Sequence, residues 1–279
     1  MPILVIGATG KTGRRITQRL SAGGHEVRAG ARTPGEALDR VEPVHFDWYD
    51  PATHAPALAG VDRVHVIPPA GRVDHAPHVA AFLDAARDAG VQRVVLMTAR
   101  GVHVSDEIPL RQNELALVAS GLQHTIVRPG WFMQNFSEGT FAPDADGVIA
   151  APAGDAPTAF VDAEDIADVA VAALTDPRHA GREYELTGPR LLTFDDVAAE
   201  LSRATGRDVV HVPVTTAAYA AALRDLGLPG EFADLFEGVL DGRNAHLSDG
   251  VARALGREPR DFADYARDTA AAGVWTPRS

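Results

Sequence analysis

A glycine-rich turn near the N-terminus constrains the fold of this chain more than any other stretch. The apolar run Pro2–Ile6 leads into Gly7-Ala8-Thr9-Gly10-Lys11-Thr12-Gly13, and Arg14–Leu20 follows with helical spacing. We expect Gly7 to permit the tight turn, Gly10 to let a pyrophosphate approach the backbone, and Gly13 to let the helix pack near the strand. The helix N-terminus, beside Thr9, Lys11 and Thr12, then suits phosphate. Strand, turn and helix in this order predict a dinucleotide site; the alternative is a glycine-rich turn that holds no ligand.

The first 130 residues alternate β-rich runs with helical stretches. This order predicts a Rossmann-type α/β fold, a doubly wound parallel sheet with helices on both faces. The expected strands are Ile3–Ile6, Glu26–Ala29, Val44–Phe46, Arg63–Ile67, Arg93–Met97 and His124–Val127, and the expected helices span about 11–22, 75–89 and 107–120.

The pattern changes from about Trp131. Short strands are expected at 147–152, 158–161, 181–186 and 209–212, helices at 162–174 and 193–205, and further helices after Thr215. We therefore predict a Rossmann domain over residues 1–130, with a returning segment at about 155–175, and a smaller, mostly helical C-terminal substrate lobe over residues 131–279.

Composition narrows the classes of protein that the chain can represent. The net charge of −12 argues against nucleic acid and anionic membrane as partners. There is no apolar run of about 18 residues, no cysteine and no leader pattern, so we expect a cytoplasmic protein without a membrane span. The oligomeric state stays open, with a homodimer as one option.

The end of the second expected strand distinguishes NAD from NADP. An NAD site usually places an acidic residue there, whereas this chain has Arg28-Ala29-Gly30-Ala31-Arg32. Arg32 is well placed to meet a 2′-phosphate, and Lys11 adds a second cation. The sequence therefore predicts NADP(H) as the cofactor; the alternative is that Arg32 is one more surface arginine.

Other cofactor contacts are expected where the following strands end, because ligands bind outside the carboxyl ends of parallel strands. Asp47 would accept from the adenine amine, and Trp48 would either stack on the ligand or pack in the core. The remaining candidates are the backbone at Pro68 and Pro69 along the adenosine, Thr98 at the nicotinamide ribose, and Pro129 at the end of the sixth strand.

The segment after the sixth strand suits a flat organic substrate. Arg128-Pro129-Gly130-Trp131-Phe132-Met133-Gln134-Asn135-Phe136 combines aromatic side chains with amides. We expect Trp131, Phe132, Gln134 and Phe136 to line a pocket for an aromatic or conjugated small molecule, with Trp131 close to the chemistry. The alternative is that the aromatic side chains form only the seam between the two lobes.

The remaining ionisable residues point to no second chemistry. His75 and His78 lie three residues apart on an expected helix, but no third ligand is near in sequence, so no metal is expected. Asp162, Glu164, Asp165 and Asp168 look like helix-start residues with a solvated face rather than a catalytic pair.

Several motifs together resemble the NmrA-like branch of atypical short-chain dehydrogenase/reductases over nearly the whole chain. The motifs are the Gly7–Gly13 turn with its Gly-x-x-Gly-x-x-Gly spacing, Arg32, Phe46-Asp47-Trp48-Tyr49-Asp50-Pro51, Val64–Pro69, Val127–Phe136, Phe160–Ala167 and Tyr184–Pro189. Within that branch the chain is similar to bacterial relatives of the ergot-alkaloid (festuclavine and agroclavine) dehydrogenases. The resemblance implies reduction of an iminium or similar conjugated electrophile by NADPH; other branch members are quinone reductases or redox sensors without turnover.

One departure from the family matters. Its typical members carry a Tyr-x-x-x-Lys acid–base pair, but Lys11 is the only lysine here, and none of Tyr49, Tyr184, Tyr219 and Tyr265 has a lysine four positions on. In our alignment Glu114 falls near the family's lysine. Glu114 would act as a catalytic residue that bonds the nicotinamide ribose or a substrate amine, or it is simply a helix carboxylate.

Three functions follow from these observations. The first is an oxidoreductase that passes hydride from NADPH to an iminium, enone or quinone in secondary metabolism; simple ketones are disfavoured because their alkoxide needs an acid. The second is an NADP(H)-binding regulator without turnover. The third is a non-redox catalyst, a cyclase or dehydratase, acting on a biosynthetic intermediate.

Overall fold

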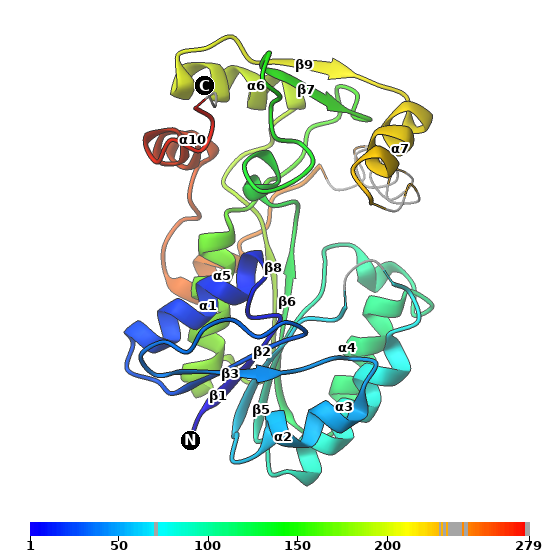
Figure 1. Cartoon of the computed structure of the whole chain (residues 1–279), viewed down its shortest axis with the longest axis vertical. Coiled ribbons are helices and arrows are strands. Elements are labelled where there is room, and N and C mark those ends of the chain that lie inside the picture. Colours follow the sequence, from blue (N-terminus) through cyan, green and yellow to red (C-terminus); the bar gives the residue numbers. More distant parts are fainter. Residues whose placement is uncertain (70–71, 229, 231–232, 234–241, 243–244, 277–279) are drawn as a thin grey trace. The chain divides into compact units, whose positions relative to one another are not determined.

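The computed structural model describes residues 1–69, 72–228, 230, 233, 242 and 245–276. A seven-stranded, fully parallel sheet with strand order β3-β2-β1-β4-β5-β6-β8 dominates it (Figure 1). The predicted doubly wound Rossmann-type sheet is therefore confirmed. Its strands are β1 (Ile3–Ile6), β2 (Val27–Ala31), β3 (Val41–His45), β4 (Arg63–Val66), β5 (Arg93–Met97), β6 (Gln123–Pro129) and β8 (Arg182–Leu186).

Helices cover both faces of this sheet, as Figure 1 shows. Leu4, Val64 and Val94 bury one face against Phe82 and Leu117 of the helices α3 and α4, while α1 and α5 pack on the other face. Strands buried on both faces explain the nearly continuous apolar runs in the sequence. The helices are α1 (Lys11–Ala22), α2 (His54–Leu58), α3 (Ala76–Asp88), α4 (Pro109–Ala119), α5 (Ala163–Thr175) and α9 (Gly250–Leu255), with the short 3₁₀ turns η1 (Pro51–Thr53), η2 (Val102–Val104) and η4 (Pro177–His179).

The chain divides into two compact units, and the sheet unit is discontinuous. Unit 1 consists of Met1–Pro129, Ala163–Leu186 and Gly250–Arg257; unit 2 consists of Gly130–Asp162, Thr187–Asp249 and Glu258–Ser279. The sequence suggested that one later segment, at about 155–175, belongs to the sheet unit. In the structure, unit 1 includes two later segments: residues 163–186 and a segment that contains the short helix α9. Gly250 allows α9 to start in close contact with β8. A Cβ at this position would lie only 1.9 Å from the carbonyl oxygen of Glu185 in that strand.

Unit 2 is built around a cluster of phenylalanine rings. Phe136 packs on Phe141, Phe160, Phe194 and Phe262 at ring-centroid distances between 5.2 and 5.7 Å. The elements around the cluster are the two-stranded parallel sheet β7 (Val148–Ala151) and β9 (Val210–Pro213), the helices α6 (Phe194–Thr205), α7 (Thr216–Asp225) and α10 (Phe262–Ala271), and the turn η3 (Met133–Phe136).

Two local predictions for unit 2 had different outcomes. Helix α6 begins as expected: the Thr193 hydroxyl accepts from the Asp196 amide, and the Asp196 carboxylate accepts from the Thr193 amide. The expected strand at 158–161 is wrong: those four described residues form only isolated bridges, from Thr158 to Leu192 and from Val161 to Phe132. Part of the region expected to be helical after Thr215 lies outside the described residues.

A buried histidine lies in the middle of the sheet. His65 follows Val64 in β4 and faces the side covered by α1 and α5, because neighbouring strand residues point to opposite faces. Its side chain is fully buried, and burial lowers the pKa of His65 from 6.5 to about 4. The folded chain therefore keeps this ring neutral at pH values where the unfolded chain protonates it.

Replacing His65 with valine is expected to flatten the acid side of the stability curve. As pH falls from about 6.5 to about 4, the unfolded state gains a proton that the folded state does not, so wild type loses about 3 kcal/mol through this group alone. Urea unfolding across this range measures the difference. Above pH 7 the two curves should run parallel, and equal acid slopes would contradict the prediction.

Across the part of the chain that the structure describes, none of the helices has the length and hydropathy needed to cross a bilayer.

Candidate functional site

The glycine turn between β1 and α1 is built almost entirely from backbone. Gly7 has φ +72°, and a Cβ there would lie 2.7 Å from Ile67 Cγ2. The Gly10 amide donates to the Gly7 carbonyl at 2.9 Å, and a Cβ on Gly13 would lie 2.1 Å from that same carbonyl oxygen. The turn is therefore pressed against the first turn of α1, which is the arrangement expected of Gly7 and Gly13.

The N-terminus of α1 forms a cradle that a phosphate would fit. Gly10 is the N-cap and places no side chain over the helix end, and Thr9 and Gly10 are exposed. Lys11 is half-buried and Thr12 is buried in the first helical turn. The first amides of a helix have no partner within the helix, so this end can donate to an anion.

Arg32 follows the strand that pairs with β1 next to the glycine turn. It comes directly after β2, and β2 pairs with β1 so that Gly30 lies opposite Ile6. The side chain is exposed and, within the described residues, has no hydrogen-bond or ion-pair partner. An exposed guanidinium directly after β2 is a suitable partner for a 2′-phosphate.

The residues after β3 and β4 have mixed roles. Asp47 uses Oδ1 to accept from the Tyr49 amide at 2.9 Å, and it is half-buried. Trp48 is only 7% exposed, packs on Phe46 and Phe82, and donates from Nε1 to the Ile67 carbonyl at 3.2 Å. Of the two roles expected for Trp48, the structure therefore shows packing in the core. Its indole fixes the chain that continues into Pro68, which is buried, and Pro69, which is half-buried.

A buried ionic cluster lies where β5 and β6 end. Glu114 on α4 is fully buried and accepts four hydrogen bonds. Arg128 donates from Nε and Nη2 at 2.7 and 2.8 Å, Arg111 donates from Nη1 at 2.9 Å, and Thr98 donates from its hydroxyl at 2.7 Å. Pro129 ends β6 next to this cluster, and its carbonyl accepts from the Arg100 amide.

These contacts argue against a catalytic Glu114. Burial raises the pKa of the Glu114 carboxyl, but the hydrogen bonds from Arg128, Thr98 and Arg111 outweigh it and hold the pKa below its ordinary value. An ionised carboxylate cannot donate a proton, and this one has no exposed surface for a substrate amine. Sequence reasoning missed Arg128 as its partner; the signal was an arginine inside the apolar strand Ile126-Val127-Arg128-Pro129.

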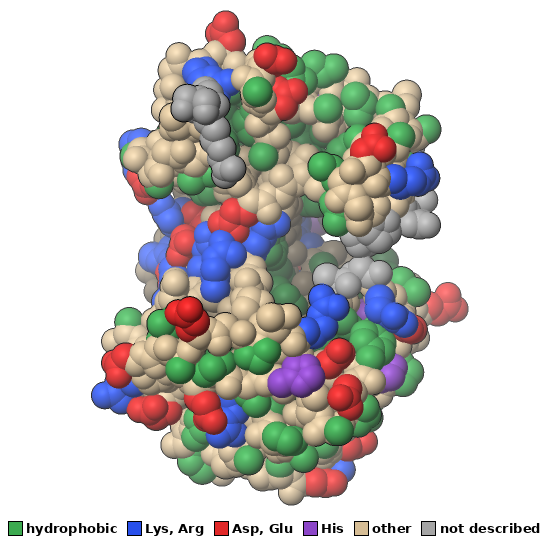
Figure 2. Space-filling model, in the orientation of Figure 1, with side chains coloured by type: hydrophobic (Ala, Val, Ile, Leu, Met, Phe, Trp, Pro, Cys, Tyr) green, Lys and Arg blue, Asp and Glu red, His purple; other side chains and the backbone are tan. Residues whose placement is uncertain are grey.

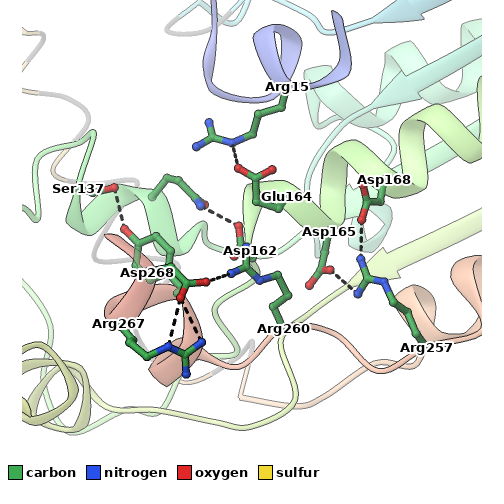
Figure 3. Close-up of polar contacts among 12 residues, drawn as sticks. Arg15, Ser137, Asp162, Glu164, Asp165, Asp168, Arg257, Arg260, Arg267 and Asp268 are labelled. Carbon is green, nitrogen blue, oxygen red and sulfur yellow. Dashed lines mark hydrogen bonds and ion pairs between the residues drawn. The ribbon is translucent and has the colours of Figure 1, made fainter. Parts of the chain in front are cut away.

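The expected solvated acidic face of α5 is wrong. Glu164 accepts from Arg15 of α1 at 2.6 Å, and Asp168 accepts from Arg19 at the same distance, as Figure 3 shows for Arg15. Asp165 has no exposed side-chain surface and pairs with Arg257 at 2.7 Å. Arginines separated from these acids by more than 80 residues thus tie α1, α5 and the segment just after α9 together, and sequence spacing gave no sign of them.

The four predicted pocket residues do not share one environment in unit 2. Phe136 is fully buried in the phenylalanine cluster, and Gln134 is buried with Nε2 donating to Asp162 Oδ1 at 2.8 Å. Asp162 is also buried and pairs with Arg260 at 3.2 Å (Figure 3). Only Trp131 and Phe132 keep part of their surface. Phe136 and Gln134 are therefore structural, because their side chains are used inside unit 2.

Among the residues that the structure describes, no three histidine, cysteine or acidic side chains gather as a metal site. His75 Nδ1 instead lies 3.1 Å from the side-chain amide nitrogen (Nδ2) of Asn113, and the His78 ring packs on Tyr49.

Comparisons with known proteins agree with this geometry. A family model described as NAD(P)H-binding matches residues 7–177. Agroclavine dehydrogenase of Claviceps fusiformis is 35% identical over 294 residues, with 100% of both chains covered. The NAD(P)H azoreductase of Xenophilus azovorans is 34% identical, covering 97% of this chain and 98% of that protein. The NADPH-dependent quinone oxidoreductase QOR2 of Escherichia coli, solved with NADPH, superposes with a TM-score of 0.82 at 26% identity, covering 96% and 99%.

Proposed function

Since this chain belongs to the NAD(P)H-binding, NmrA-like family of oxidoreductases, we propose that it binds NADPH and uses it to reduce a small conjugated electrophile of the iminium, enone or quinone type. The proposal has two parts, the choice of NADPH over NADH and the class of substrate. Each is supported by a different group of residues.

The choice of NADPH is supported by Arg32. The backbone cradle of Gly7, Gly10 and Gly13 would hold the pyrophosphate of either dinucleotide, so it does not discriminate. Arg32 follows β2, the strand paired with β1, Lys11 opens α1, and no acidic residue follows β2 directly to bind ribose hydroxyls. A guanidinium without a protein partner among the described residues gains more from a phosphate than from a hydroxyl.

Replacing Arg32 with alanine is expected to raise the Kd for NADPH about 10- to 100-fold, because a charge-assisted hydrogen bond is lost. The Kd for NADH should change by less than about twofold, since NADH has no 2′-phosphate. Calorimetric titration of both cofactors measures this. Arg40→Ala is the matched control, an exposed arginine that pairs with Glu26 instead. Equal weakening of NADPH and NADH would reject the 2′-phosphate role.

The class of substrate is supported by one observation: the sequence lacks the Tyr-x-x-x-Lys acid–base pair typical of dehydrogenases. Lys11 is the only lysine, and the carboxylate near the missing lysine, Glu114, is ionised and fully hydrogen-bonded. A ketone becomes an alkoxide that needs a proton from an acid. An iminium ion is neutralised by hydride, and a quinone distributes charge over oxygens that water can protonate.

When bound, NADPH supplies the hydride; the chain supplies binding and orientation. The backbone of residues 7–13 and Arg32 would hold the phosphates, and the edge formed by Asp47, Pro68 and Pro69 would border the adenosine. Trp131 and Phe132 stay the candidates for contact with an aromatic substrate. The relatives that act on a clavine and on azo compounds support a conjugated substrate, and the clavine relative supports a role in secondary metabolism.

We further propose that nucleic acid and membranes are not partners. The net charge is −12, and on the face drawn in Figure 2 basic side chains lie beside acidic ones rather than in one extended basic patch.

The test is NADPH oxidation with a panel of acceptors. A cyclic iminium, a quinone and an azo dye should each be compared with a simple cyclic ketone of similar size, following the absorbance of the reduced cofactor. We expect turnover with at least one conjugated acceptor and none with the ketone. Turnover only with the ketone, or tight NADPH binding without any turnover, would contradict the proposal.

A further inference from the structure

We propose that Glu114 is a positioning residue that fixes the Thr98 hydroxyl as a pure hydrogen-bond acceptor, and that this oxygen accepts from a ribose hydroxyl on the nicotinamide half of the cofactor. Thr98 is thereby excluded as a proton donor to the substrate. The inference rests on the proposed function, because it assumes that a nicotinamide dinucleotide occupies the site.

The direction of the Thr98–Glu114 hydrogen bond is fixed by charge. Glu114 lies in a bidentate pair with Arg128, and Arg111 adds a further donor to the same carboxylate oxygen as Arg128 Nη2. Two guanidinium groups on one fully buried carboxyl keep it ionised. An ionised carboxylate has no proton to give, so the 2.7 Å contact can only be Thr98 donating to Oε1.

This direction determines what Thr98 can offer to a ligand. A hydroxyl carries one proton and two lone pairs, and the proton of Thr98 already points at Glu114. Only the lone pairs remain for a ligand. A ketone, a quinone oxygen or a developing oxyanion needs a donor and would gain nothing from them. A ribose hydroxyl is a donor and matches them.

The position of Thr98 favours the nicotinamide half. It comes directly after β5 and its amide donates to the Val127 carbonyl of β6, so it lies at the carboxyl edge, two strands from the glycine turn after β1. Thr98 as a whole residue is 8% exposed, and its side chain is anchored by the hydrogen bond to Glu114. Ligands of parallel sheets lie along this edge.

The experiment compares NADPH with adenosine 2′,5′-bisphosphate, which lacks the nicotinamide ribose. Thr98→Val removes the oxygen at nearly constant volume, and Thr98→Ser restores it. Thr125→Val is the matched control, because Thr125 is also a buried threonine of the same sheet, with its hydroxyl bonded to the His179 carbonyl. Calorimetry gives both Kd values, and kcat with a conjugated acceptor is measured at saturating NADPH.

We expect Thr98→Val to raise the Kd for NADPH about tenfold, with Thr98→Ser and Thr125→Val within about twofold of wild type. The Kd for the bisphosphate should stay within about twofold for all three variants.

Four outcomes would overturn the assignment. Equal weakening of NADPH and the bisphosphate by Thr98→Val would mean a merely structural role. Unchanged NADPH affinity with kcat reduced at least about tenfold would mean that Thr98 donates to the substrate. If wild type binds both ligands and Thr98→Val binds them equally well with the same kcat, the role of Thr98 is rejected but the proposed function is not. If wild type binds neither ligand, the proposed function is rejected as well.

Discussion

Replacing Glu114 with glutamine is expected to lower the free energy of unfolding by about 3–5 kcal/mol, which is the cost of breaking a buried ion pair by removing one partner. The change leaves the Arg128 guanidinium, whose side chain is 7% exposed, without its bidentate carboxylate. Arg128 also pairs with Glu183, but that carboxylate is half exposed and lies on the other side of the guanidinium, at Nη1. Urea unfolding monitored by circular dichroism measures the loss.

Glu183→Gln is the matched control, because it removes a partner of the same arginine at an exposed position. It should cost less than about 1 kcal/mol. Because hydrogen bonds hold the pKa of Glu114 lower in the folded chain than in the unfolded one, its contribution is complete above the ordinary carboxyl pKa and is lost as pH falls through the folded value. The difference between wild type and E114Q should therefore shrink in acid. A Glu114→Gln protein as stable as wild type but inactive would restore the catalytic interpretation.

Replacing Gly13 with alanine is expected to cost about 1–3 kcal/mol of folding free energy, as overpacking does, and to lower NADPH affinity at least about tenfold. The new Cβ would lie 2.1 Å from the Gly7 carbonyl oxygen and 2.9 Å from Ala8 Cα. Both are backbone atoms and cannot rotate away. The first turn of α1 must therefore move from the glycine turn, and the amides that would meet the pyrophosphate move with it.

Gly10→Ala is the contrasting variant. Its Cβ would lie 3.2 Å from the Gly7 carbonyl oxygen at an exposed position with φ −78°, so the folded chain should tolerate it better than Gly13→Ala. Its effect should fall on NADPH binding, because the methyl group occupies the space that the phosphate approaches. Thermal unfolding and cofactor titration of both variants separate the two roles. Normal NADPH affinity in Gly13→Ala would show that the close approach is dispensable.

The sheet could be predicted because its signals are local. Strands such as Ile3–Ile6 and Arg93–Met97 are mostly apolar runs and were predicted to the residue. Strand β3 (Val41–His45) contains Glu42 and Pro43, and it was predicted too late in the sequence, at Val44–Phe46. The glycine turn was equally accessible, since Gly7 and Gly13 are required by backbone geometry that a short window of sequence specifies.

The ionic and aromatic partners could not be predicted because they depend on contacts distant in sequence. Glu164 looked like an ordinary helix-start acid, but the arginines that neutralise it lie on α1, 145 and 149 residues earlier. Phe136 looked like a pocket residue because aromatic side chains suit both pockets and cores. Its burial against Phe194 and Phe262 became visible only when the later helices were in place.

Because unit 1 is discontinuous in sequence, it cannot be completed early in synthesis or isolated as a single fragment. During synthesis, residues 1–129 emerge with six of the seven strands, yet β6 keeps an open edge until β8 has been translated. Helix α1 also lacks the acids of α5 until then. A fragment that stops at Pro129 would expose this edge and the apolar surface under α5, and such edges promote aggregation. No single cut frees a complete nucleotide-binding module, so biochemical work on the cofactor site calls for the whole chain.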